Sequence, residues 1–230
     1  MSLAIVYTRA ALGIEAPLIT VEVHLSNGLP GLTMVGLPET TVKEARDRVR
    51  SALINSGYAF PAKKITINLA PADLPKEGGR YDLPIALALL VASEQLNTTR
   101  LNQYEFVGEL ALTGGLRGVP GAIPSAMEAI KAGRRIVVSS DNAAEVGLIG
   151  GSDCLVADHL QEVCAFLAGQ TSLSPPLAEA PARDERYEDL LDVIGQQQGK
   201  RALEIVAAGG HNLLLIGPPG TGKTMLASRL

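Results

Sequence analysis

Gly217-Pro-Pro-Gly-Thr-Gly-Lys-Thr224 decides how the C-terminal part of the chain folds, because it has the form G-x-x-x-x-G-K-[ST] of a phosphate-binding loop. An apolar run at 211–216 precedes it, and we expect that run to be a buried parallel strand. Residues 225–230 follow it and are mostly good helix formers. A strand, a glycine loop and a helix in this order place backbone N–H groups where they can bind phosphate oxygens.

The motif also predicts the roles of single side chains. Lys223 should reach the β- and γ-phosphates of a nucleotide, and the hydroxyl of Thr224 should ligate Mg²⁺. We therefore predict ATP and Mg²⁺ as cofactors, with the ATP-binding residues Gly217, Pro218, Pro219, Gly220, Thr221, Gly222, Lys223 and Thr224.

The chain ends shortly after this motif, at Leu230. A P-loop ATPase also needs an acidic Mg²⁺ partner, a water-positioning residue and usually an arginine. None of these can follow the motif here, so we expect the chain to be the front of a longer protein. We predict that this fragment alone does not hydrolyse ATP.

Composition excludes several classes of protein. Hydrophobic residues make up 47% of the chain, which is incompatible with general disorder, and the net charge of −4 does not indicate a strongly basic nucleic-acid-binding domain. Cys154 and Cys164 match no zinc-ligand spacing and are predicted to be small core residues. We see no signal peptide and no apolar run of membrane-spanning length, so we expect a soluble cytoplasmic protein.

Strands and helices alternate along residues 1–169, which predicts a mixed α/β domain. We expect strands at 2–7, 18–25, 32–35, 64–69, 105–112, 134–139 and 154–156, and helices that begin near Thr41 or span 82–96, 122–132, 142–146 and 158–167. The strands 18–25 and 32–35 are expected to pair as a hairpin. Residues 170–182 hold three prolines and are predicted to be a linker, after which 183–230 begin a second domain.

Two stretches carry a family resemblance. Pro75-Lys-Glu-Gly78 and residues 107–123 resemble the protease domain of the Lon family, whose two-layer α+β fold is that of the second domain of ribosomal protein S5. Together with Asp192-Val-Ile-Gly-Gln196 and the phosphate-binding loop, they resemble the YifB/ComM family. In that family a Lon-like N-terminal domain is joined to a magnesium-chelatase-type AAA+ ATPase, so the resemblance implies this fold, with the AAA+ domain truncated.

The chain departs from Lon peptidases at both catalytic positions. Arg80 stands where the resemblance implies the nucleophilic Ser, and Pro124 stands where it implies the catalytic Lys. Arginine is neither a nucleophile nor a usable base, and proline has no side-chain donor or acceptor. Ser125 lies next to the lost Lys position without a plausible base, and Lys76 is expected to be solvated. We therefore predict a catalytically dead peptidase domain.

The resemblance implies an ATP-driven homo-hexameric ring that acts on branched or single-stranded DNA, as in branch migration during recombination and natural transformation. A helicase-type ATPase is the main interpretation. The alternatives are a magnesium-chelatase-like ATPase subunit, a Lon-like peptidase and a non-enzymatic oligomerisation module. Charge alone gives these candidate DNA-contacting residues: Lys43, Arg46, Arg50, Lys63, Lys64, Arg80, Arg117, Arg134 and Arg135.

Overall fold

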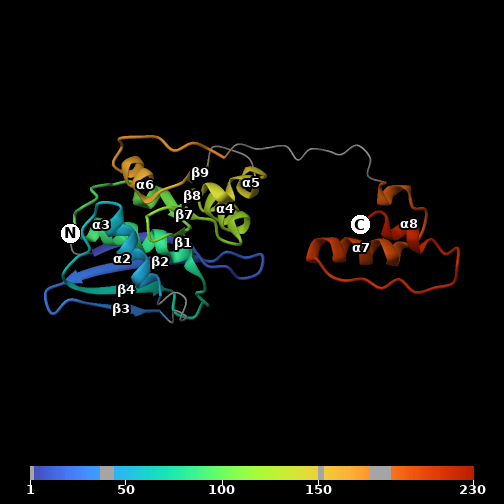
Figure 1. The fold of residues 1–230 in the computed structure, drawn as a ribbon, viewed down its shortest axis with the longest axis horizontal. Coiled ribbons are helices and arrows are strands. Elements are labelled where there is room, and N and C mark those ends of the chain that lie inside the picture. The colour runs from blue at the N-terminus through green and yellow to red at the C-terminus, as the bar shows by residue number, and fades with distance from the viewer. Residues whose placement is uncertain (1–2, 37–43, 150–152, 177–187) are drawn as a thin grey trace. The chain divides into compact units, whose positions relative to one another are not determined.

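We analysed a computed structural model of the chain, which describes residues 3–36, 44–149, 153–176 and 188–230. The chain divides into two compact units, residues 1–179 and 180–230 (Figure 1). Each unit has its own arrangement of elements and its own buried core.

A seven-stranded mixed sheet forms the centre of the first unit, with the strand order β3-β4-β2-β1-β5-β8-β9. The β1–β2 and β2–β4 pairs are antiparallel, and the other neighbours are parallel. The bounds are β1 Leu3–Arg9, β2 Leu18–Ser26, β3 Gly31–Val35, β4 Lys64–Ala70, β5 Tyr104–Phe106, β8 Arg135–Ser139 and β9 Cys154–Ala157. A separate two-stranded sheet joins β6 (Glu109–Leu110) to β7 (Leu116–Arg117).

Helices cover the sheet on one face along most of its width. The main core combines alternating residues of β2 and β4 with the helices α2 (Ala45–Asn55), α3 (Asp82–Ala92) and α6 (Leu160–Leu167). Alternation along a strand places successive side chains on opposite faces, which explains why this half of the sheet is buried on one side only.

The β8–β9 end of the sheet is different, because both of its faces are buried. Val137 belongs to the main core, whereas Ile136 and Val138 pack in a second cluster with α4 (Ala122–Lys131) and α5 (Ala143–Gly147). The fold is therefore an α/β mixed-sheet fold, and Cys154 and Cys164 are both buried and free, as predicted.

Strand β3 corrects one prediction. It does not pair with β2 as a hairpin but lies parallel to β4, from Gly31 opposite Lys64 to Val35 opposite Asn68. A parallel pair needs a crossover connection, and α2 lies in the connection between β3 and β4. The turn at 26–31 therefore leads to the outer edge of the sheet, while β2 is paired by β1 and β4.

Three boundaries also differ from those predicted. The expected strand 105–112 is divided into β5 and β6, and the helix expected to reach residue 96 ends at Ala92. The N–H of Val156 donates to the carbonyl of Ser174, so the predicted linker 170–182 begins with residues that pack on the first unit. The helix start expected near Thr41 lies outside the described residues.

The second unit consists of α7 (Gln197–Gly209), the short helix α8 (Lys223–Ala227) and a 3-10 turn at Leu190–Asp192. Its buried core is small and contains Val193, Leu203 and Leu226. The strand expected at 211–216 is not formed, because no neighbouring strand is described beside it and Ile216 is 86% exposed. Among the described helices of the whole chain, none has the length and apolar character needed to cross a membrane.

Candidate functional site

The predicted phosphate-binding loop forms a tight curl before α8. Gly220 has φ +80° and Gly222 has φ +81°, which is the left-handed region that favours glycine. Gly222 caps α8, and the N–H of Leu226 donates to its carbonyl. Leu226 is buried against Leu203 of α7 and so anchors the helix that follows the loop.

The side chain of Lys223 folds back onto the start of the loop. Its ammonium group donates to the carbonyl oxygens of Gly217 and Pro218, both at 2.9 Å. The hydroxyl of Thr221 also donates to Pro218, at 2.9 Å. The loop therefore holds a positive charge at the centre of its curl, and binding of a phosphate would replace carbonyl contacts of Lys223 with phosphate oxygens.

The hydroxyl of Thr224 makes no hydrogen bond to the residues that the structure describes, and the residue is exposed in the first turn of α8. A free hydroxyl next to a centred ammonium fits a Mg²⁺-bound nucleotide. In the described ranges, no three or more His, Cys, Asp or Glu side chains lie together in a way that could hold a metal ion.

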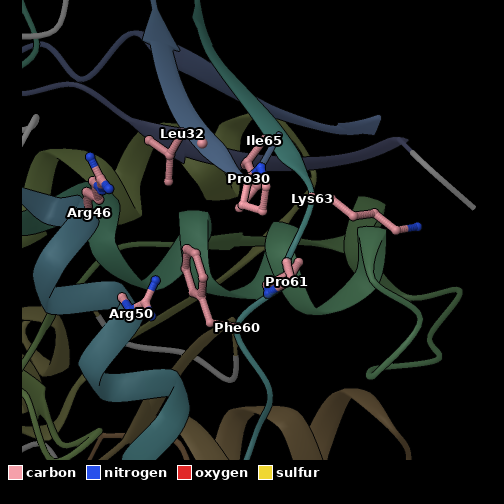
Figure 2. A pocket seen from close by; sticks show the side chains of 10 residues that line it. Pro30, Leu32, Arg46, Arg50, Phe60, Pro61, Lys63 and Ile65 are labelled. Carbon is pink, nitrogen blue, oxygen red and sulfur yellow. The ribbon is translucent and has the colours of Figure 1, made fainter. Parts of the chain in front are cut away.

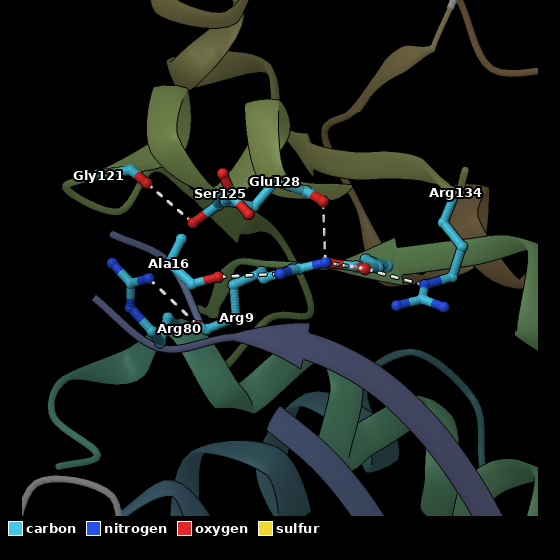
Figure 3. Close-up of polar contacts among 8 residues, drawn as sticks. Arg9, Ala16, Arg80, Gly121, Ser125, Glu128 and Arg134 are labelled. Carbon is cyan, nitrogen blue, oxygen red and sulfur yellow. Dashed lines mark hydrogen bonds and ion pairs between the residues drawn. The ribbon is translucent and has the colours of Figure 1, made fainter. Parts of the chain in front are cut away.

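Arg80, which the Lon resemblance places at the nucleophile position, is buried in the first unit with 4% of its surface exposed. Its guanidinium donates to the carbonyl of Arg9 at 3.3 Å (Figure 3) and also to the carbonyl of Pro120. Burial lowers the pKa of this guanidinium, which nevertheless remains protonated. The prediction that Arg80 is a candidate DNA contact is therefore wrong, because the side chain points into the protein and is bonded there.

Arg80 and Pro124 lie at the same place in the fold although they are far apart in the sequence. A Cβ atom built on Gly121 would be 3.5 Å from a guanidinium nitrogen of Arg80 and 3.9 Å from the ring of Pro124. The two positions at which the Lon resemblance implies the dyad therefore face a common point beside the N-terminus of α4. Neither side chain can act as a nucleophile or a base there.

The two neighbouring candidates are also committed to structural hydrogen bonds. The hydroxyl of Ser125 is buried and donates to the carbonyl of Gly121 at 2.9 Å (Figure 3). Lys76, expected to be solvated, is instead fully buried and donates to the carbonyls of Pro71 and Leu74. Its pKa is lowered chiefly by burial. Lys76 is buried rather than solvated because the loop from Pro71 to Lys76 folds so that its own carbonyl groups surround the ammonium group of Lys76.

A buried ion cluster beside Arg80 was not found by sequence reasoning. Arg9 donates to both carboxylate oxygens of Glu105, at 2.6 and 2.8 Å, and Arg134 donates to the same carboxylate at 2.9 Å. Arg9 also donates to the carbonyls of Ala16 and Glu128, both at 3.0 Å (Figure 3). The available signal was weak: Arg9 follows the expected strand 2–7 and Glu105 begins the expected strand 105–112, and charged side chains in such apolar surroundings are rarely buried unless they are paired.

The structure separates the candidate DNA-contacting cations into those that contact a carboxylate or an aromatic ring of the fold and those that lie on the surface around the start of β4. Arg134 pairs with Glu105, Arg135 lies over the ring of Tyr104, and Arg117 pairs with Glu109. Arg46, Arg50, Lys63 and Lys64 remain on one side of the first unit around the start of β4, and Lys43 lies outside the described residues.

Comparison with protein families gives two matches. The family described as subunit ChlI of Mg-chelatase matches residues 21–142, and the family described as magnesium chelatase, subunit ChlI, matches residues 189–230. The second match contains the whole phosphate-binding loop.

Curated relatives match the chain along its whole length. YifB of Salmonella typhimurium is 77% identical over 230 residues, YifB of Escherichia coli is 75% identical over 230 residues, and competence protein ComM of Haemophilus influenzae is 59% identical over 237 aligned residues. In each case the alignment covers 100% of this chain and 46% of the relative, so the chain spans a little under half of their length.

Proposed function

Because the chain belongs to the magnesium-chelatase ChlI family and is similar to YifB and ComM along its whole length, we propose that it is the N-terminal part of an ATP-dependent AAA+ motor that remodels DNA. The observation that carries the proposal is the glycine curl, with the ammonium group of Lys223 at its centre and the free hydroxyl of Thr224 beside it. ATP would supply a phosphoanhydride bond whose cleavage drives the motor, with Mg²⁺ shared between the nucleotide and Thr224.

DNA as the substrate is supported by the similarity to a competence protein, since competence is the capacity to take up DNA. In this proposal the full-length protein is a cytoplasmic homo-hexamer of the helicase type that acts in recombination. Residues 1–169 form a Lon-like domain of the ribosomal protein S5 type, residues 170–182 connect it to the motor, and residues 183–230 begin the motor. Arg80 and Pro124 make that first domain a scaffold rather than a peptidase.

A magnesium-chelatase-like subunit is the second candidate, because the description of the matching family names that complex. The two candidates differ in what stimulates ATP hydrolysis. We expect branched or single-stranded DNA to stimulate the full-length protein. Stimulation by the other subunits of a porphyrin-metallating complex, with none by DNA, would support the second candidate instead.

The nucleotide site is tested by Lys223→Ala in the full-length protein. The variant removes the charge that would neutralise the β- and γ-phosphates, so we expect ATP hydrolysis to fall by at least about 100-fold. Lys200→Ala is the matched control, since Lys200 lies on α7 in the same unit but outside the loop. Hydrolysis by Lys223→Ala at the rate of the control would contradict the assignment of the loop.

A further inference from the structure

A hollow of about 210 Å³ opens on the first unit beside the cations that the structure leaves on its surface (Figure 2). Its wall combines the start of β3, two turns of α2 and the loop that leads into β4. The side chains that matter for its chemistry are Arg46, Arg50, Phe60 and Lys63, with Leu32 and Ile65 at the base. No carboxylate lines it, so the hollow has a positive electrostatic potential.

The two arginines of the hollow differ from those arginines of the first unit that pair with carboxylates. Arg46 and Arg50 are exposed, lie one turn apart on α2, and form no ion pair with the described residues. By contrast, Arg9, Arg48 and Arg134 are each bonded to a carboxylate.

Arg50 is held in place without losing its hydrogen-bonding capacity. Its guanidinium lies over the ring of Phe60, 5.0 Å from the centroid, and a ring face orients the cation without neutralising it. Figure 2 shows Arg46 and Arg50 one above the other on α2, with Phe60 beside Arg50, and the side chain of Lys63 directed away from them on the other side. A pre-oriented planar guanidinium is suited to bidentate contact with a phosphate.

The size of the hollow restricts its ligand. Pockets for drug-sized molecules are roughly 300–1,000 Å³, so this one is suited to a phosphate group rather than to a complete nucleotide. Lys63 on the rim and Lys64 at the exposed start of β4 continue the positive surface beyond the hollow. A positive surface that continues beyond the hollow is suited to a polymer with several phosphates. Because the hollow is concave, it admits a flexible single strand better than a rigid duplex.

We propose that the hollow between α2, β3 and the loop before β4 binds a backbone phosphate of single-stranded DNA, with Arg46 and Arg50 as its direct ligands. The inference rests on the proposed function for the choice of DNA, and it assigns the DNA contact to a defined surface of the N-terminal unit. It also separates this contact from the nucleotide site, which is built by Lys223 in the other unit.

The test uses the full-length protein with both arginines replaced, Arg46→Ala and Arg50→Ala. Binding of a fluorescein-labelled oligo(dT) strand of about 20 nucleotides is followed by fluorescence anisotropy at several salt concentrations. We expect the affinity to fall by at least about tenfold. The slope of log K against log salt should become shallower by about 0.7, since the loss of one single-strand phosphate contact contributes about 0.7.

The matched control removes two exposed cations elsewhere in the same unit, Arg117→Ala and Lys131→Ala. This control removes the same amount of positive charge from a different place on the unit. We therefore expect its affinity for oligo(dT) to stay within about twofold of that of the unmodified protein. The thermal unfolding midpoints of both double variants are measured to show that each is folded. Equal affinity of the two double variants for oligo(dT) would overturn the proposal.

A second arm distinguishes a DNA backbone from a free nucleotide or phosphate. In a Lys223→Ala background, ATP and inorganic phosphate are tested as competitors of oligo(dT), and complete competition by either at micromolar concentration would overturn the choice of a polymer.

DNA-stimulated ATP hydrolysis is measured in parallel, in proteins that retain Lys223. If DNA binding depends on the arginines but DNA never stimulates hydrolysis, the proposed function fails and this inference stands. If DNA stimulates hydrolysis and the arginine variants bind normally, the inference fails and the function stands.

Discussion

Strand β4 and the run 211–216 are both short apolar segments, yet only β4 is a strand. β4 is paired by β2 on one side and by β3 on the other, and its Ile67 is completely buried in the main core. Ile216 is 86% exposed, and no backbone hydrogen bond to a neighbouring strand is described for 211–216. The difference teaches that an apolar pattern predicts a strand only where the fold provides a partner for its backbone groups.

The same contrast applies to charged side chains. The first unit buries Glu105 between two arginines, whereas the second unit keeps Glu204 and Arg201 on the surface of α7. Identical residue types therefore have different energetic roles in the two units. The predictions below test this contrast, beginning with the largest expected effect.

Neutralising the buried carboxylate should have the largest effect on stability. Glu105→Gln leaves Arg9 and Arg134 without a counter-charge in a buried site, so we expect a loss of about 3–5 kcal/mol in the free energy of unfolding of the first unit. Glu204→Gln, which breaks an exposed i,i+3 pair, should cost at most about 1 kcal/mol. Hydrogen exchange followed by mass spectrometry reports each unit separately. Equal effects of the two substitutions would remove the contrast.

Truncating an isoleucine should have a similar but somewhat smaller effect. Ile67→Ala removes a completely buried side chain of β4 and should destabilise the first unit by about 2–5 kcal/mol. Ile216→Ala removes a side chain that already faces solvent in this chain, so its effect should lie within about 0.5 kcal/mol. The comparison is made on the 230-residue chain by urea unfolding and hydrogen exchange. A large effect of Ile216→Ala would show that 211–216 is packed.

The buried carboxylate of Asp82 should make the stability of the first unit depend on pH. Burial, partly offset by hydrogen bonds from Arg48, raises the pKa of Asp82 from 3.8 to about 6. A raised pKa means that the folded state binds the proton more tightly. This contribution is complete below pH 4 and is lost as the pH rises through 6, with a magnitude of about 3 kcal/mol at 1.36 kcal/mol per pKa unit.

The measurement compares urea unfolding of the unmodified chain and of Asp82→Asn from pH 4 to pH 7. Asparagine does not titrate, so the difference in unfolding free energy between the two proteins should change across this interval. The carboxylate of Glu109, which also raises the pKa of Asp82, remains in both proteins. A constant difference between the two would show that Asp82 keeps the same protonation state over this range.

Local sequence predicted the elements whose signal lies within one segment. The helix that begins after Gly121 and the strand that ends at Ser139 were placed to within a residue or two, because their periodicity and end signals are contiguous. The partner of β3 and the pairing of residues 170–174 were not predicted, since both depend on segments far away in the sequence. The same limit explains why Arg80 and Lys76 were expected on the surface, whereas both are buried.

The sequence by itself determined the chemistry that the side chains can perform. Arg80 and Pro124 exclude a serine–lysine dyad by their identity alone, and the motif from Gly217 to Thr224 indicates a phosphate site without any coordinates. Only the tertiary structure decided which charges are paired, because Arg9 and Glu105 are 96 positions apart and meet only when β1 and β5 lie side by side. Arg9, Arg48, Arg117 and Arg134 pair with carboxylates, whereas Arg46 and Arg50 stay available on the surface, and no local pattern in the sequence contains that information.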